Sequence, residues 1–290
     1  MPAEIGQVSV FFPAEKESSG LRFHLHAPFV PELSRASVKE TPANAPLFEQ
    51  LAHLCGKSLY GIRDLGLLNA ETLGAFPNKQ DSLPKRYICI RDAIIREFNE
   101  GPLTPTYDRS HAPAKTLFQS KAAVKEVFTD QDLNVVAGDG DSSLKWAASA
   151  PQKNSNSDRM IASLAIRDWD IDDLVTTLNE IEASYPWQSP NLVVKGWLEA
   201  KPIEWLQKFY SLLHRELSED GGAFALRDCP IVKLQDGSFG KGKGSYFPSD
   251  IGDDDGFRRV DPGIYQSGKS KPHQIAARKL LEEVGVREVD

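Results

Sequence analysis

The chain has 290 residues, 40% of them hydrophobic, and its 34 basic and 41 acidic residues leave a formal net charge of −7. This length predicts about two average domains and allows a buried core, which argues against a disordered chain. The negative charge argues against general electrostatic wrapping of nucleic acid or of an anionic membrane. Because no apolar run approaches the roughly 18 residues that cross a bilayer, and no signal-peptide pattern opens the chain, we expect a cytoplasmic protein without membrane partners.

The cysteines are few and far apart. Cys55, Cys89 and Cys229 fit neither a disulfide framework nor the Cys-x-x-Cys spacing of a metal knuckle. We expect them to be small apolar residues in a reducing compartment.

The first 60 residues predict a strand pair and a helix. Alternating apolar residues over 8–12 and 21–25 suit two strands, which we expect to form a hairpin across the connector 13–20. Helical spacing begins after Asn44, a residue type that caps helices, and continues over 45–60.

The middle of the chain predicts further helices and one strand. Apolar residues recur at helical spacing over 83–98 and again over 113–128. Residues 133–137 predict a short strand that ends in the Gly-Asp-Gly-Asp turn at 138–141.

A change in composition predicts a domain boundary. Residues 149–158 have no periodicity and are rich in Ser and Asn, which is typical of a linker. We therefore predict one domain over 1–148, with the strand pair and its helices, and a second over 159–290. Helices are expected in the second domain over 159–165, 171–184 and 203–217.

The end of the chain returns to strands. Residues 231–234 and 245–247 flank the Asp-Gly pair at 236–237 and predict a hairpin, and a helix is expected over 275–284, ended by Gly285. The order of strands, helices, strands and a last helix predicts an α+β, or mixed α/β, fold. It would have an N-terminal strand pair with helices, a central helical region, and a C-terminal hairpin plus helix.

Two stretches resemble ligand-binding loops without completing them. Gly237, Gly242 and Lys243 have the spacing of a phosphate loop, but Gly244 stands where a Ser or Thr would bind magnesium and strand-like residues follow. We interpret this stretch as a basic hairpin loop. The carboxylates of 168–173 resemble the opening of a calcium loop that lacks its glycine and its bidentate Glu, and we expect them to cap a helix.

Two histidines and a cluster of basic residues are candidates for metal binding and for nucleic-acid binding. His24 and His26 would point to the same side of a strand, as in a two-histidine metal site, but no third ligand is evident. An exposed polar strand face is favoured, and no metal site is expected. The basic residues within 269–279 lack interleaved aromatic residues, so a solvated helix face is favoured over nucleic-acid contact.

Three stretches, spread over most of the chain, share a pattern with a known family. Residues 23–37 place an aromatic strand end before Ser34-Arg35, and an Asn-x-x-Leu helix start follows at 44–47. The other stretches are Trp146-Ala-Ala-Ser149 with Asp158-Arg159 and Trp169, and 230–239 with Tyr246-Phe247-Pro248 and 280–286. Together they resemble sacsin-like proteins with a heat-shock-protein-90-like ATPase of the GHKL superfamily, in the region that follows the nucleotide-binding domain.

The resemblance implies an ATPase module that this sequence lacks. The superfamily holds magnesium and activates water with a Glu and an Asn on one helix, and it reads adenine with an Asp-x-Gly-x-Gly. Asp64, Asp250 and Asp261 each begin Asp-x-Gly without the second Gly. We therefore expect no cofactor in this chain. ATP and magnesium would bind to a module upstream, lost, or acting in trans, unless the chain is a stand-alone descendant of the middle region.

Ser34-Arg35 carries the one catalytic role that the resemblance implies. In heat-shock chaperones of this class such a pair places a guanidinium on the γ-phosphate, where it can stabilise the charge that develops in phosphoryl transfer. Here Ala36 stands where those chaperones have Glu. The alternative is a surface Arg35 that caps the next helix or pairs with Glu32 or Glu40.

We therefore expect a non-catalytic, chaperone-like interaction region that transmits nucleotide state from an ATPase module to an unidentified client protein. One alternative is enzymatic, with Arg35 supplied in trans as half of a split ATPase. Another is a nucleic-acid-associated scaffold in a bacterial defence system, although the net charge makes nucleic acid the less expected partner.

Overall fold

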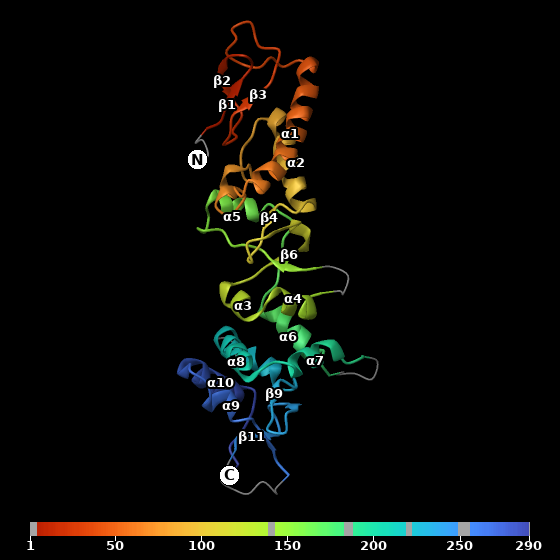
Figure 1. Cartoon of the computed structure of the whole chain (residues 1–290), viewed down its shortest axis with the longest axis vertical. Coiled ribbons are helices and arrows are strands. Elements are labelled where there is room, and N and C mark those ends of the chain that lie inside the picture. The colour runs from red at the N-terminus through yellow and green to blue at the C-terminus, as the bar shows by residue number, and fades with distance from the viewer. Residues whose placement is uncertain (1–4, 139–142, 183–187, 219–221, 249–255, 290) are drawn as a thin grey trace. The chain divides into compact units, whose positions relative to one another are not determined.

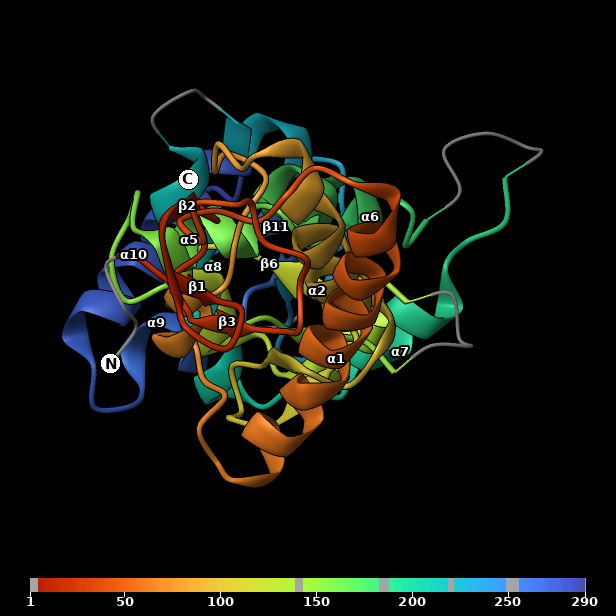
Figure 2. The same cartoon turned by 90° about the horizontal axis from the view of Figure 1, so that it is seen from above.

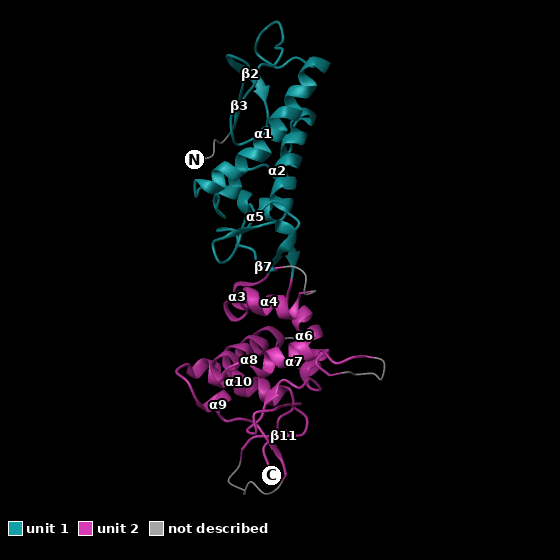
Figure 3. Cartoon of the chain, turned by 45° about the vertical axis from the view of Figure 1, so that its right-hand side comes forward, with its two compact units in different colours: residues 1–119, 144–168 teal, residues 120–143, 169–290 magenta. Residues whose placement is uncertain are grey.

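The structure is a computed structural model that describes residues 5–138, 143–182, 188–218, 222–248 and 256–289. Its helices and several small sheets form the predicted α+β fold (Figure 1). The chain divides into two compact units, unit 1 over Met1–Gln119 with Leu144–Asp168 and unit 2 over Ser120–Ser143 with Trp169–Asp290 (Figure 3). Among the described residues, no helix has both the length and the apolar character to cross a membrane.

A three-stranded sheet opens unit 1. β1 (Gln7–Ser9) pairs antiparallel with β2 (Pro13–Ser18) and parallel with β3 (Leu25–His26). The predicted hairpin pairs the wrong segments, because the predicted connector is itself β2. The side chains of β2 are mostly exposed and only Ala14 is buried, so this strand lacks the apolar alternation from which strands are predicted.

Two long helices, α1 (Ala45–Asp64) and α2 (Ile88–Glu100), pack side by side in unit 1 (Figure 2). The helix predicted over 45–60 is confirmed and continues to Asp64. The helix predicted over 83–98 begins later, because Pro84 is extended and leads into a 3₁₀ turn, η3 (Lys85–Tyr87). The core of unit 1 includes Val8, Leu25, Phe29, Phe48, Leu59, Tyr87, Ile90, Ile94 and Phe98.

Asn44 does not cap α1 with its side chain, contrary to the prediction. It lies in a 3₁₀ turn, η1 (Pro42–Asn44), and is buried. Its amide oxygen accepts the Val30 N–H at 2.8 Å, and its amide nitrogen donates to the carbonyls of Val30 and Lys39 at 3.0 and 2.8 Å. The side chain therefore fixes the loop before α1 rather than the helix itself.

Short elements complete unit 1. They are η2 (Thr72–Ala75), β4 (Thr104–Pro105), β5 (His111–Ala112), η4 (Ala114–Thr116), β6 (Leu117–Gln119), β7 (Lys145–Trp146), α5 (Asn156–Ile161) and β8 (Arg167–Asp168). β4 pairs with β5, and β6 lies between β7 and β8, parallel to both. The helix predicted over 113–128 is wrong in its first half. Leu117 and Phe118 are adjacent strand residues that are both buried, and this double burial imitates a helical stripe.

The segment predicted as a linker, 149–158, lies inside unit 1, and the division between the units falls elsewhere. Its Ser155 hydroxyl accepts the Asp158 N–H at 3.2 Å and caps α5, which begins earlier than the helix predicted over 159–165. The Ser157 hydroxyl donates to the Glu71 carbonyl at 3.0 Å. These polar residues are thus capping and packing residues, which their composition alone does not reveal.

Helices dominate unit 2. They are α3 (Ala122–Val127), α4 (Asp130–Val136), α6 (Ile171–Asn179), α7 (Leu192–Glu199), α8 (Ile203–Leu217), α9 (Gly263–Gln266) and α10 (Lys271–Glu283), with a 3₁₀ turn, η5 (Gly222–Leu226). α8 has the predicted bounds, whereas α7 was not predicted. The helix predicted over 171–184 ends at Asn179 in α6, and residues 183–184 lie outside the described residues.

The strand predicted over 133–137 is the helix α4 instead. The Thr129 hydroxyl accepts the Asp132 N–H at 3.2 Å, while the Asp132 carboxylate accepts the Thr129 N–H at 2.9 Å. This capping box starts a helix despite the β-branched valines that favour a strand. Asp170 caps α6 in the same way, which confirms that the carboxylates of 168–173 begin a helix.

The C-terminal strands pair differently from the prediction. β9 (Val232–Lys233) pairs with β10 (Phe239–Gly240) directly across the Asp-Gly turn, where Gly237 has a φ of 86°. β11 (Ser245–Tyr246) instead pairs in parallel with β12 (Arg258–Arg259). The predicted last helix is present in α10, which begins earlier, at Lys271, and Gly285 follows it with a φ of 105°.

Candidate functional site

An open pocket of about 860 Å³ lies in unit 1, between β3 with the residues before it, one face of α1, and η2 with its neighbours. Its lining is mainly apolar. We call it the apolar groove and define it by Leu51, Leu54, Cys55, Ile62, Leu67 and Phe76.

The groove exists because α1 is apolar around more of its surface than its neighbours cover. Leu51 and Leu59 are buried, whereas Leu54, three residues after Leu51, is 61% exposed. Leu67, just beyond the helix, is 56% exposed. Both leucines line the same pocket, and an apolar patch of this kind marks an interaction surface more often than a single exposed residue does.

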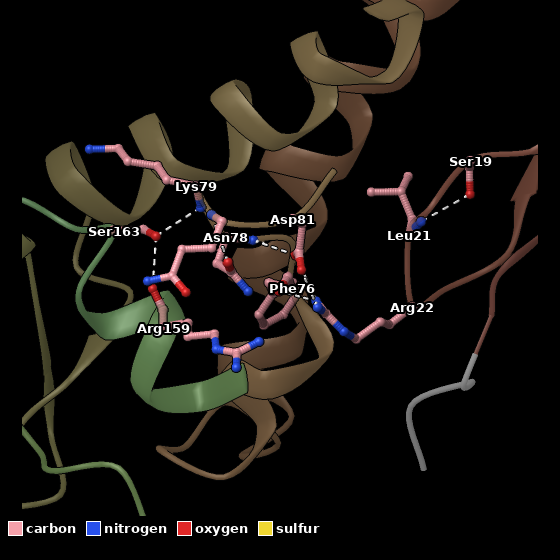
Figure 4. A network of polar contacts seen from close by, with 10 residues as sticks. Ser19, Leu21, Arg22, Phe76, Asn78, Lys79, Asp81, Arg159 and Ser163 are labelled. Carbon is pink, nitrogen blue, oxygen red and sulfur yellow. Dashed lines mark hydrogen bonds and ion pairs between the residues drawn. The ribbon is translucent and has the colours of Figure 1, made fainter. Parts of the chain in front are cut away.

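A polar network fixes the Phe76 end of the groove (Figure 4). The Arg22 guanidinium donates to both carboxylate oxygens of Asp81, at 2.9 and 2.5 Å, and to the Phe76 carbonyl at 3.0 Å. The Lys79 N–H donates to the Ser163 hydroxyl at 2.9 Å, which ties the same loop to the end of α5. Because these contacts hold the backbone, this wall of the groove is formed before any partner arrives.

His24 and His26, which were considered as a two-histidine metal site, lie at the edge of the groove. His24 and His26 are exposed, and both line it. The His24 Nδ1 accepts the Gln7 N–H at 2.9 Å, and the His26 ring lies edge-on to Phe11 at 6.4 Å. Within the part of the chain that the structure describes, no cluster of three or more His, Cys, Asp or Glu residues could hold a metal ion.

The three thiols are free, and burial raises the pKa of each. The pKa rises to about 12 for Cys229, whose thiol donates to the Leu178 carbonyl at 2.8 Å, and to about 11 for Cys55. Because the thiolate is the nucleophile, these cysteines are poor catalytic candidates.

We therefore expect Cys229 to resist iodoacetamide at mildly alkaline pH in the native chain. It should react in urea, because unfolding exposes its thiol to water. Mass spectrometry of the alkylated peptides measures this directly. Equal alkylation rates of Cys229 in the native and the unfolded chain would contradict the buried thiol.

Arg35 lies in an exposed turn between Pro31 and Val38, which form an isolated antiparallel bridge. Its φ of 59° is unusual for a residue with a side chain, and its N–H donates to the Glu32 carbonyl at 2.8 Å. The guanidinium lies over the Phe12 ring at 5.6 Å. Arg35 does not line the apolar groove, and its phosphate-sensing role stays a prediction.

The glycine-rich stretch of unit 2 connects two strands but is not the predicted hairpin loop, because β10 pairs with β9 and β11 pairs with β12. β10 precedes Gly242 and β11 begins directly after Gly244, where a phosphate loop would begin a helix. A Cβ at Gly242 would lie 2.1 Å from the Val284 carbonyl oxygen, so this glycine serves close packing. The Lys241 ammonium pairs with Glu182 at 2.9 Å.

Comparison with protein-family models, with curated proteins and with solved structures finds no match to this chain. We therefore infer a function from the chemistry of the pockets in this chain.

Unit 2 contains a cluster of aromatic rings that was not predicted from the sequence. Lys201 forms an ion pair with Asp132, and its ammonium lies 5.0 Å from the Trp197 ring and 4.7 Å from the Trp205 ring. Phe128 stacks on Trp197 at 6.0 Å. The regular spacing of Trp197, Lys201 and Trp205 was the available signal. The cluster is occupied by the chain's own lysine, which indicates a structural role.

Proposed function

We propose that this chain is a non-catalytic interaction region, the middle part of a sacsin-like, heat-shock-protein-90-like ATP-binding protein, and that it receives an apolar segment of a partner in the apolar groove. ATP and magnesium would bind to a module outside these residues. The observation that carries it is the exposed leucine surface of α1 and the residues after it, held open beside a fixed wall.

The groove has the chemistry of a helix-binding surface. An amphipathic helix buries leucine-like side chains at helical spacing in such a groove and leaves its polar face in water. Leu54 and Leu67 are exposed in the free chain and would lose contact with water on binding. Burial of apolar surface stabilises a complex by roughly 25 cal/mol for each Å² covered. Polar groups occur at the edge, where His24, His26 and Glu71 can meet the rim of a bound segment.

The polar residues near the groove have structural roles that support binding over catalysis. The Arg22 guanidinium donates to both the Asp81 carboxylate and the Phe76 carbonyl. Burial raises the pKa of Cys55, which disfavours its thiolate.

A fluorescein-labelled amphipathic peptide, with leucines on one helical face and lysines on the other, tests the proposal by fluorescence anisotropy. We expect saturable binding to the whole chain. Leu54→Glu is expected to weaken it at least tenfold, or about 1.4 kcal/mol, because binding would bury an unpaired carboxylate. Since Leu54 is exposed, the variant should keep the fold, which circular dichroism checks.

Leu65→Glu is the matched control. Leu65 follows α1 directly and is 74% exposed, but it does not line the groove. Its substitution adds the same charge and should leave the affinity unchanged. No saturable binding, or equal weakening by both substitutions, would rule out the groove as the binding surface.

A further inference from the structure

A second pocket, of about 140 Å³, lies in unit 2 among α3, α8 and the start of α10. Lys208, Ser211 and Arg215 line it from one face of α8, and His273 lines it from α10. Glu126 of α3 also lines it. We call these five residues the basic pocket.

Several polar groups of the basic pocket have no partner among the residues that the structure describes. Within the described ranges, the Lys208 ammonium, the Ser211 hydroxyl and the His273 ring make no hydrogen bond or ion pair. Arg215 donates from Nε to Glu216 at 3.1 Å, and its two terminal nitrogens are unpaired in the same part of the chain. Donors from two helices therefore face one small cavity with their bonding capacity unused.

The charges of the pocket favour an anion. Lys208 and Arg215 are donors only, and charge-assisted hydrogen bonds from such groups to oxyanions are about twice as strong as neutral ones. Glu126 opposes them with one negative charge, which leaves the cavity lined by more positive than negative charge. The start of α10 adds no free amide of His273, since the Ser270 hydroxyl already accepts that N–H at 3.5 Å. The side chains alone make the site.

We propose that the basic pocket binds a phosphate group, either as the free ion or as the end of a monoester. The tetrahedral oxygens of phosphate can accept from several directions at once, as the donors of α8 and α10 require, whereas a planar carboxylate would use fewer of them. The volume holds one phosphate-sized group and leaves a ribose and a base outside. The inference is independent of the proposed function, because the apolar groove belongs to unit 1.

Isothermal titration calorimetry of the whole chain at constant ionic strength tests the proposal, with inorganic phosphate and phenyl phosphate as probes and chloride as the background anion. We expect saturable phosphate binding that Lys208→Gln weakens at least tenfold. Lys208 has no partner to lose in the described part of the chain, so this variant should stay folded. Glu126→Gln should tighten binding about threefold, because it removes the opposing charge.

Lys271→Gln is the control, since Lys271 is exposed on α10 outside the pocket and the substitution makes the same change of charge. Unchanged affinity in this variant supports the pocket. Binding of both probes identifies a monoester site, and binding of inorganic phosphate alone identifies a site for the free ion. Absence of saturable binding, equal loss in both lysine variants, or weaker binding after Glu126→Gln would overturn the proposal.

Discussion

Replacement of Asp132 by alanine is expected to lower the free energy of unfolding of unit 2 by about 3–5 kcal/mol. The Asp132 side chain is 6% exposed and forms an ion pair with Lys201, which is itself largely buried. It also accepts the Trp197 indole N–H at 2.8 Å and the Thr129 N–H at 2.9 Å. Its removal leaves a buried ammonium without its carboxylate and a helix without its capping box, and urea unfolding followed by tryptophan fluorescence measures the loss.

The stabilisation by Asp132 should depend on pH with a definite sign. Burial alone would raise the pKa of Asp132, but hydrogen bonds from Lys201, Trp197 and Thr129 lower it below its usual value. The stabilisation is therefore present above the pKa of the unfolded carboxyl and is lost as the pH falls through the lower, folded pKa. The difference in free energy of unfolding between the wild-type chain and Asp132→Ala should therefore shrink within this acid range.

Asp172→Ala is the control for the loss of a carboxylate near a helix start. Asp172 is exposed in the first turn of α6, where its charge is worth about 0.3–1 kcal/mol through the helix dipole. An Asp132→Ala effect no larger than that of Asp172→Ala would contradict the buried ion pair.

Replacement of Phe98 by alanine is expected to lower the free energy of unfolding of unit 1 by about 3–5 kcal/mol. Phe98 is 0% exposed and its ring packs against Phe76, with the centroids 5.5 Å apart. The substitution leaves a cavity in the core of unit 1, next to Phe76, which lines the apolar groove. Circular dichroism during urea unfolding measures the change.

Phe11→Ala provides the comparison for an aromatic residue outside the core. Phe11 is 80% exposed, and substitutions at such positions commonly change stability by less than about 0.5 kcal/mol. If Phe98→Ala proved as mild as Phe11→Ala, the packing of α2 described above would be wrong.

The long amphipathic helices could be predicted from the sequence, because each carries enough turns to show its period. α8 follows Pro202 and has the predicted bounds, and α1 is extended by only one turn. The strands, at two to six residues, are too short for alternation to be read. α4 was predicted as a strand because its valines outweighed a capping box that depends on Thr129 and Asp132 acting together.

The apolar groove could not be predicted, because a helical stripe does not reveal which of its residues a neighbour covers. Leu51 and Leu54 belong to one predicted stripe, yet only Leu51 is buried. The opposite wall comes from Phe76, whose position depends on the Arg22–Asp81 contact between segments far apart in the sequence. Arg35 was named from a resemblance, and nothing in its neighbours predicts its positive φ.

The parallel strands β6, β7 and β8 stand at the three points where the chain passes between the units, at Gln119, Leu144 and Asp168. Neither unit is therefore a continuous piece of polypeptide. A fragment that stops after β6 would lose both of its strand neighbours, and one that starts at Trp169 would lack α3 and α4. Dissection of this protein by simple truncation would yield incomplete folding units, whereas two genes that join 1–119 directly to 144–168 and 120–143 directly to 169–290 would keep the segments of each unit together.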